Sequence, residues 1–285
     1  MNILVIGGTR YAGRRFVRRM LDGGHRVTIV ARGRTLDPFA DTVERIPCER
    51  RELWQSPLLQ GREWDVAVDQ VCFDVGDALS AMRALDGRVG RYIVTSSQSV
   101  YDAGPNILEE VFQPERHVFG SVADKFEDYN EAKRQMEATI ARTATMPWVT
   151  LRVPLIMAHD DSSGRLQWHL DRIRQNQPIM LPNPAAAISM IHADDMARAL
   201  EHLVTADHRG PMNAASVEPI AIGDFVATLG RLLGQEPAIV REGSGEDHSP
   251  YGIGEDWWMN VDAMSASGCT LRPIAEWLPS LVSSQ

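Results

Sequence analysis

Short apolar runs alternate with stretches of helical periodicity along the first half of the chain. The runs predict six strands, at Asn2–Ile6, Arg26–Val30, Val43–Ile46, Asp65–Val68, Tyr92–Thr95 and Trp148–Val153. Phe16, Val17 and Met20 recur at the spacing of an amphipathic helix, and a second long helix is expected over residues 125–144. Strands and helices that alternate in this way predict an α/β fold with a doubly wound parallel sheet.

Composition and charge narrow the possible functions. The 285 residues are 44% hydrophobic and 24% charged, which is ordinary for a globular protein. A net charge of -9 disfavours non-specific binding to nucleic acid, which needs basic groups to neutralise phosphates. The three cysteines form no CxxC motif, and no apolar run approaches the roughly 20 residues of a membrane span. We therefore expect a cytoplasmic protein with a small-molecule substrate and no membrane contact, whose net charge disfavours a nucleic-acid partner.

The stretch GGTRYAG at residues 7–13 lies between the first predicted strand and the first predicted helix. A dinucleotide-binding turn occupies this place, where free backbone N–H groups and the positive end of the helix meet a diphosphate. Gly7 permits the tight turn, and Gly13 lets the helix approach the strand. The residues expected to bind the cofactor here are Gly7, Thr9, Arg10, Tyr11 and Ala12.

The regular alternation of predicted strands and helices ends after Pro154. Predicted elements become shorter there, and prolines cluster at positions 178, 182 and 184. We expect a Rossmann-type dinucleotide-binding domain over residues 1–154 and a smaller, mainly substrate-binding lobe over residues 155–285. Segments at about 187–215 are expected to return to the Rossmann layer. Residues 101–125 read as a loop, since they contain Gly104-Pro105 and Pro114.

The end of the second strand bears on the choice of cofactor. An NAD site usually has Asp or Glu there, to bind the ribose 2′-hydroxyl. This chain has Arg32 and Arg34 instead, and two guanidinium groups could hold a 2′-phosphate, with Arg10 as a third. These arginines could also be solvated surface charges. We therefore expect NADP as cofactor and keep NAD as the alternative.

Two further patterns indicate residues that could transfer a proton to or from a substrate hydroxyl and hold that hydroxyl in place. Tyr129 and Lys133 are four residues apart on a predicted helix and so share one face. A nearby ammonium stabilises phenolate, which lets a tyrosine exchange a proton with a substrate hydroxyl while hydride moves to or from nicotinamide. Ser97 lies in the hydroxyl-rich stretch TSSQS, at a strand end that faces the ligand crevice of such a sheet, where it could hold the substrate oxygen.

The assembled pattern resembles the extended short-chain dehydrogenase/reductase superfamily, also called the NAD-dependent epimerase/dehydratase group. The motifs that carry the resemblance occur in the family's order and span nearly the whole chain: VIGGTRYAG, VTSSQSVY, YNEAK, LRVPLI, ISMIHADDMARA and MNAASVEPIAIGDF. The resemblance implies that Tyr129 is the catalytic acid/base, that Lys133 holds the nicotinamide ribose and lowers the tyrosine pKa, and that Ser97 orients the substrate.

The resemblance also implies further ligand contacts. It places Val71 and Cys72 along the adenosine half of the cofactor, Glu49 near the adenine, and Pro154 and Leu155 beside the nicotinamide. Thr95 falls in the cofactor site. The substrate cleft would include Gln98, Asp160, Arg165 and Trp168, whereas Trp257, Trp258 and Trp277 are assigned to packing. No metal site is expected, because the His and Asp spacings match no standard pattern.

Departures from the family pattern narrow the reactions and substrate classes that the resemblance implies. Arg10 replaces the middle glycine, and the GGTR turn, the ARGR strand end and HDDSSGRLQW look most like a subgroup with chloroplast stem-loop-binding proteins and bacterial epimerase-like members. Gln98 and Ser99 stand where dehydratases have an Asp-Glu pair, which argues against dehydration. Leu155 stands where sugar-nucleotide epimerases usually have Asn, which weakens a UDP-sugar assignment.

These observations predict an NAD(P)-dependent oxidoreductase or epimerase that acts on a secondary alcohol or ketone of a small, sugar-like substrate. The alternative is a non-catalytic protein on the same fold, which senses cofactor or associates with RNA. By analogy with relatives, the chain is expected to be a monomer or a homodimer.

Overall fold

The computed structural model describes residues 1–122 and 124–283. Its largest element is a parallel sheet whose strands are β1 (Asn2–Ile6), β2 (Arg26–Ala31), β3 (Glu44–Pro47), β4 (Val66–Asp69), β5 (Tyr92–Ser97), β7 (Trp148–Val153) and β12 (Gly210–Asn213). The order across the sheet is β12-β7-β5-β4-β1-β2-β3. The chain first adds β2 and β3 on one side of β1, and then adds the later strands on the other side, beginning with β4. Where the direction of strand addition reverses, a parallel sheet leaves a ligand crevice at the carboxyl ends of its strands.

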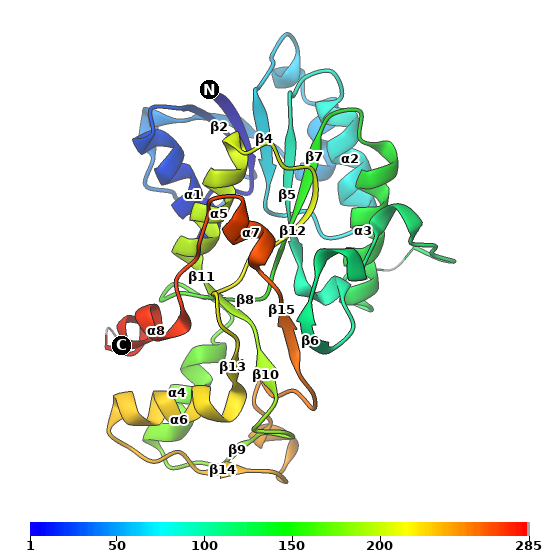
Figure 1. The fold of residues 1–285 in the computed structure, drawn as a ribbon. Helices are drawn as coiled ribbons and strands as arrows, with labels where there is room; N and C mark the ends of the chain where they lie inside the picture. Colours follow the sequence, from blue (N-terminus) through cyan, green and yellow to red (C-terminus); the bar gives the residue numbers. More distant parts are fainter. Residues whose placement is uncertain (123, 284–285) are drawn as a thin grey trace.

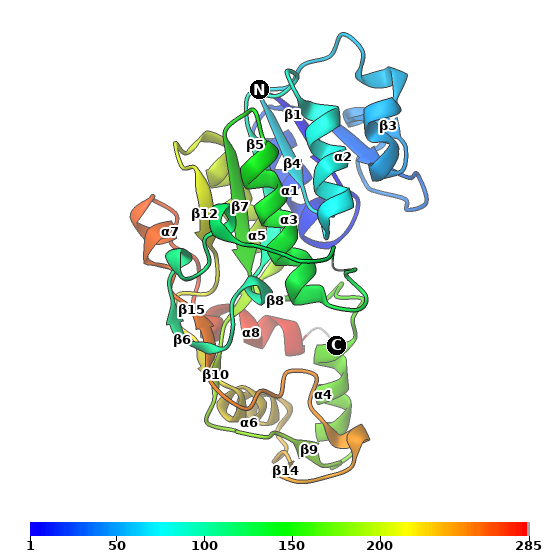
Figure 2. The same cartoon turned by 90° about the vertical axis from the view of Figure 1, so that its right-hand side faces the viewer.

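Helices cover both faces of this sheet (Figures 1 and 2). Helices α1 (Tyr11–Asp22) and α5 (Ala193–Thr205) pack on one face, and α2 (Val75–Leu85) and α3 (Tyr129–Thr143) pack on the other. Ile3 and Val5 are buried in the core under α1, and Leu4 is buried in the core under α2. The first strand is a continuous apolar run because both of its faces are covered.

A second group of elements lies beyond the carboxyl ends of the large sheet (Figure 1). Its strands are β6 (Gly104–Ile107), β8 (Leu155–Met157), β9 (Ile179–Met180), β10 (Ala187–Ile188), β11 (Met190–His192), β13 (Ile220–Ala221), β14 (Ile239–Val240) and β15 (Trp257–Met259). The helices in this part are α4 (Arg165–Arg174), α6 (Ile222–Leu233) and α8 (Ile274–Ser283), while the short α7 (Asp262–Ala266) lies beside β12. They enclose a separate apolar core around Trp277 and Phe225. None of the described helices is both long and apolar enough to cross a membrane.

The doubly wound α/β fold predicted from the sequence is confirmed. Residues 187–215 connect the two groups, because α5 packs against α1 and β12 pairs with β7. The division of the chain near residue 154 into a cofactor domain and a substrate lobe stays a prediction.

Two local expectations were wrong. Residues 104–107 form β6, because they pair with β15 from a distant part of the chain, and no local pattern reveals that partner. The helix expected from residue 125 begins at Tyr129, because the Asp128 side chain accepts a hydrogen bond from the Glu131 amide (2.9 Å) and so caps the first turn.

Candidate active site

A cavity of about 590 Å³ lies where the carboxyl ends of the large sheet face the second group of elements. It is lined by segments that are far apart in the sequence, from the first residue of α1 to β15. The structure brings nine of the predicted site residues to this cavity: Tyr11, Thr95, Ser97, Gln98, Tyr129, Lys133, Pro154, Leu155 and Arg165.

The glycine turn beside this cavity is tightly packed. Gly7 has a positive φ of 89°, and a Cβ atom on it would lie 2.7 Å from Val71 Cγ1. A Cβ on Gly13 would lie 2.6 Å from the carbonyl oxygen of Gly7. Both positions therefore require glycine, and the same packing sets Val71 against the turn.

The amino end of α1 is free to meet an anion. Its N-cap residue, Arg10, makes no side-chain capping bond, and the first turn contains no acidic residue. The backbone amides of this turn, which includes Thr9 and Ala12, keep the partial positive charge of the helix end. The donor set thus fits a diphosphate.

Tyr11 joins the glycine turn to β8. It has a positive φ of 50°, and its hydroxyl donates a hydrogen bond to the carbonyl oxygen of Ile156 (2.6 Å). Burial raises the pKa of Tyr11 well above its usual range, so the phenol remains a donor. The Tyr11 side chain therefore forms a fixed wall of the cavity.

The arginines after β2 lie away from the cavity lining and close to one carboxylate. Arg32 Nη1 lies 3.8 Å and Arg34 Nη2 lies 3.6 Å from Glu49 Oε1, and all three side chains are about half exposed or more. The Arg10 Nε–H donates to Thr35 Oγ1 (3.0 Å) and so points to the same corner. Two guanidinium groups thus face one carboxylate after β2, and the Arg10 guanidinium is bonded to the neighbouring Thr35.

Cys72 contributes its backbone rather than its thiol. The side chain is fully buried, and desolvation raises the pKa of the Cys72 thiol to about 12, so the sulfur stays neutral. Its carbonyl oxygen accepts a hydrogen bond from Lys133 Nζ at 2.7 Å.

Tyr129 and Lys133 share one face of α3, as the spacing predicted, but in different environments. Lys133 is buried, and its ammonium donates to the carbonyl oxygens of Cys72 and Thr95 (2.7 and 3.2 Å). Tyr129 is 40% exposed at the mouth of the cavity, and the Lys133 nitrogen lies 6.0 Å from its ring centroid. The ammonium is therefore fixed by the sheet, while the phenol faces incoming ligand.

A buried ionic network lies one turn further along α3, and the sequence analysis missed it. Arg152 on β7 pairs with Glu137 (2.6 Å), and both side chains are fully buried. Ser96 donates a hydrogen bond to the same carboxylate. The signal in the sequence was an arginine inside the apolar run Trp148–Val153, where a charge needs a buried partner.

Several buried polar atoms at the cavity have no hydrogen-bond partner among residues 1–122 and 124–283. They are Gln70 Nε2, Thr95 Oγ1, Gln98 Oε1 and Trp257 Nε1, each from a residue that lines the cavity. Gln98 Nε2 donates to the carbonyl oxygen of Trp257 (2.6 Å), which ties the two residues together. Ser97 Oγ accepts from the Ser99 amide (3.1 Å), so its own proton is free to be donated. Trp257, assigned to packing, thus belongs to the cavity wall.

The three candidates around α4 are placed differently. Arg165 lines the cavity, with its guanidinium 5.6 Å from the centre of the Tyr251 ring. Asp160 lies outside the lining because it pairs with Arg14 and Arg15 of α1, both at 2.8 Å. Trp168 also lies outside, since its ring packs 4.8 Å from the ring of His169.

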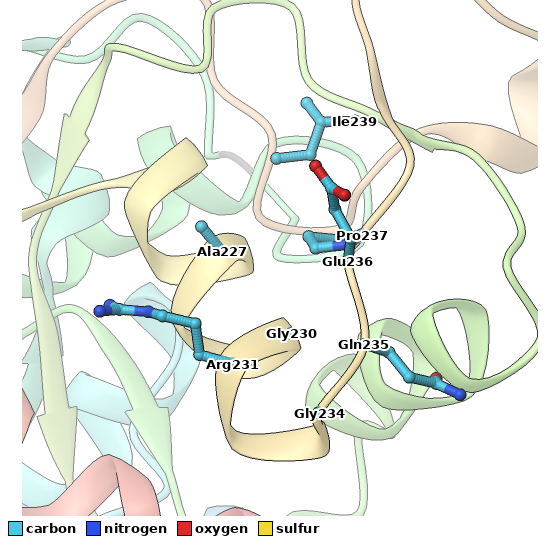
Figure 3. Close-up of a pocket in the computed structure, with 8 residues that line it drawn as sticks. All are labelled: Ala227, Gly230, Arg231, Gly234, Gln235, Glu236, Pro237 and Ile239. Carbon is cyan, nitrogen blue, oxygen red and sulfur yellow. The ribbon is translucent and has the colours of Figure 1, made fainter.

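A second hollow, of about 450 Å³, lies at the carboxyl end of α6 (Figure 3). It is lined by small and apolar residues together with Arg231, Gln235 and Glu236. Figure 3 shows the side chains of Arg231 and Gln235 extending away from each other rather than converging on one point. The convergent polar groups of the first cavity make it the better candidate for an active site.

The chain is similar to several known proteins. A profile of the NAD dependent epimerase/dehydratase family matches residues 75–215. The 2'-dehydrokanamycin reductase of Streptomyces kanamyceticus is 26% identical over 246 residues, which cover 82% of this chain and 67% of that protein. The chloroplast stem-loop binding protein of 41 kDa b of Arabidopsis thaliana is 24% identical over 216 residues. These residues cover 69% of this chain and 53% of that protein, so the chain spans about half of its length.

Solved structures show the same fold. The UDP-glucose 4-epimerase of Thermotoga maritima, determined with UDP-glucose, superimposes with a TM-score of 0.73 at 14% sequence identity. The match covers 100% of this chain and 98% of that one.

Proposed function

We propose that this chain, which is similar to the NAD dependent epimerase/dehydratase family over residues 75–215, is an oxidoreductase or epimerase that interconverts a secondary alcohol and a ketone in a small, sugar-like molecule. The observation that carries the proposal is the meeting of Ser97, Tyr129 and Lys133 in one cavity beside the glycine turn. A hydroxyl, a phenol and a buried ammonium that converge beside a diphosphate-binding turn suit proton transfer coupled to hydride transfer.

The residues that would hold the nicotinamide dinucleotide follow from the fit of the glycine turn. The amides of Thr9, Tyr11 and Ala12 would bind the diphosphate, while the Gly7 amide stays bonded to the Val30 carbonyl oxygen (3.1 Å) and Lys133 would bind the nicotinamide ribose. When bound, the nicotinamide supplies the hydride donor or acceptor. Pro154 and Leu155 line the cavity between β7 and β8 and would flank the nicotinamide.

The proton would move through Tyr129. Its phenol faces the cavity mouth and would give a proton to the substrate oxygen during reduction, or take it during oxidation. Ser97 would donate a hydrogen bond to the same oxygen. Its Oγ accepts from the Ser99 amide, and this bond leaves the hydroxyl proton available for the substrate. Two of the three Lys133 donors are used by Cys72 and Thr95, which leaves one N–H for a ligand.

We propose NADP as the cofactor on the balance of charge after β2. Two guanidinium groups, on Arg32 and Arg34, lie near the single carboxylate of Glu49, and a third, on Arg10, donates to the neighbouring Thr35. A 2′-phosphate would displace the long contacts of Arg32 and Arg34 with Glu49 and form charge-assisted hydrogen bonds instead.

The substrate would contact Gln98, Arg165 and Trp257. Gln98 and Trp257 offer one acceptor and one donor, which suits a neutral hydroxyl-bearing molecule. The related fold from Thermotoga maritima holds UDP-glucose, which supports a sugar-like ligand. Leu155, in place of the usual asparagine, favours a molecule other than a UDP-sugar.

Purified protein analysed for bound nucleotide tests this proposal most directly. We expect NADP or NADPH to copurify or to bind on addition, with NADPH fluorescence as the readout. Replacing Tyr129 by Phe should nearly abolish turnover and leave NADPH affinity unchanged. Full turnover in Y129F, or wild-type protein that binds neither NADPH nor NADH, would contradict the proposal.

A further inference from the structure

The chain has only two lysines, and both lie against the same aromatic ring. Arginine supplies every other basic residue that counts toward the 29 in the sequence. Lys125 Nζ lies 4.7 Å and Lys133 Nζ lies 4.9 Å from the centroid of the Phe73 ring, which forms part of the cavity wall. The two ammonium groups are therefore no more than about 10 Å apart, which is comparable with the screening length of 0.1 M salt.

Lys133 is accounted for by its two carbonyl acceptors, but Lys125 is not. Lys125 is half-buried and lies in the segment just before α3. Its ammonium contacts the rings of Phe73 and Phe126, the latter at 5.3 Å, and forms no ion pair with any carboxylate in the described part of the chain. Two of the acidic residues near it in sequence serve the backbone, since Asp124 accepts from the Phe126 amide and Asp128 caps α3.

The segment that carries Phe73 also contacts the glycine turn. Val71, two residues before Phe73, packs against Gly7, and Gln70 Nε2 lies 3.2 Å from where a Cβ on Gly13 would be. The segment of residues 70–73 thus runs from the glycine turn to the two lysines. A ligand that extends from the turn to Lys133 would pass along this segment, and the Lys125 ammonium lies 4.7 Å from the Phe73 ring at its end.

We propose that Lys125 is a cofactor-binding residue whose ammonium binds the phosphate on the nicotinamide side of the diphosphate. This inference rests on the proposed function, which places a dinucleotide in the cavity. Without an anion, the ammonium rests on the faces of two aromatic rings, an interaction weaker than a charge-assisted hydrogen bond to phosphate. An anion in the cavity therefore draws Lys125 from Phe73. A compact ammonium suits this position, because it can turn between ring and phosphate without the planar geometry that a guanidinium requires.

Equilibrium binding of NADPH, followed by its fluorescence, tests the role of Lys125 without any turnover. K125M should weaken NADPH binding about tenfold, the size expected for one partly exposed charge-assisted hydrogen bond. K125R keeps the charge and should lose less affinity than K125M. R62M removes a positive charge whose partner is Glu44, outside the cavity lining, and should leave the affinity unchanged.

A shorter ligand locates the contact. Adenosine 2′,5′-bisphosphate has no nicotinamide-side phosphate, so its affinity should be the same for K125M and wild type. Equal NADPH affinity in K125M and wild type would overturn the inference, and so would an equal loss for both ligands, which would indicate general damage to the site. If wild-type protein binds neither NADPH nor NADH, the proposed function itself fails, and the role of Lys125 fails with it.

Discussion

Glu137 on α3 and Arg152 on β7 form an ion pair in which both side chains are fully buried, with 2.6 Å between Oε2 and Nη2. The pair fixes the helix that carries Tyr129 and Lys133 to the sheet. Arg152 also donates to the carbonyl oxygens of Glu109 and Phe112 (2.9 and 3.0 Å), so the same guanidinium holds the loop before α3. Each N–H group of this guanidinium has a hydrogen-bond acceptor, as a buried charge requires.

Replacing Arg152 by Met should destabilise the protein by about 3–5 kcal/mol, because the carboxylate of Glu137 would remain buried without its partner. Urea denaturation measures the change in the free energy of unfolding. The second change E137L, added to R152M, should restore most of the loss, since it removes the uncompensated charge. R134A is the matched control, because Arg134 pairs with an almost fully exposed Asp102, and should cost less than about 1 kcal/mol. A loss as small in R152M as in R134A would contradict this account.

The fold was predictable because its signals are local. The apolar runs, the glycine turn at residues 7–13 and the spacing of Tyr129 and Lys133 each lie within a few consecutive residues. The rest depends on contacts across long separations, such as the pairing of β6 with β15 and the bond from Gln98 to the Trp257 carbonyl. Those contacts have no periodicity, and so Trp257 reads as a packing residue until the structure brings it to the cavity.

Cofactor preference should depend on the guanidinium groups at the end of β2. R34A should weaken NADPH binding about tenfold and leave NADH binding nearly unchanged, because only NADPH has the 2′-phosphate. E49Q should tighten NADPH binding a few-fold, since it removes the carboxylate 3.6 Å from Arg34 that competes with the phosphate. Fluorescence titration with both nucleotides measures the two affinities. Equal losses for NADPH and NADH in R34A would place this arginine outside the 2′-phosphate site.

His169 should make stability depend on pH. Burial lowers the pKa of His169 to about 4, whereas an exposed histidine titrates near 6.5. Its Nδ1 faces the carbonyl oxygen of Arg165 (2.8 Å) and must carry the proton, so Nε2 accepts from the Ser249 hydroxyl (2.7 Å). As the pH falls, the unfolded chain protonates this histidine before the folded protein does. The contribution of His169 to the free energy of unfolding is therefore complete above about pH 6.5 and is lost as the pH falls toward 4.

Over that interval the lost contribution should reach roughly 3 kcal/mol. Carboxylates titrate in the same range, so the informative quantity is the difference between wild type and H169Q in the slope of unfolding free energy against pH. The slope should be steeper in wild type between pH 4 and 6.5 and equal to that of H169Q above pH 7. Identical slopes throughout would mean that His169 does not stay neutral in the folded protein.

Trp257 should affect ligand binding and stability in opposite directions. Its indole Nε1 is buried and has no acceptor in the described part of the chain, so W257F removes a donor that costs free energy while unpaired. We expect the stability of W257F to be unchanged or up to about 1 kcal/mol higher, as for a residue kept for function. If that N–H binds the substrate, the KM of W257F should rise about tenfold while NADPH affinity stays constant.

Trp277 provides the matched control, because its Nε1 donates to the buried Ser216 hydroxyl (3.0 Å). W277F should therefore lower stability by about 1–3 kcal/mol and leave KM unchanged. Thermal unfolding and steady-state kinetics on the two variants separate the roles, since loss of a structural tryptophan lowers stability without changing KM, and loss of a substrate contact raises KM without lowering stability. Destabilisation of W257F with no change in KM would return Trp257 to a packing role and leave Gln98 and Arg165 as the candidates for substrate recognition on that side of the cavity.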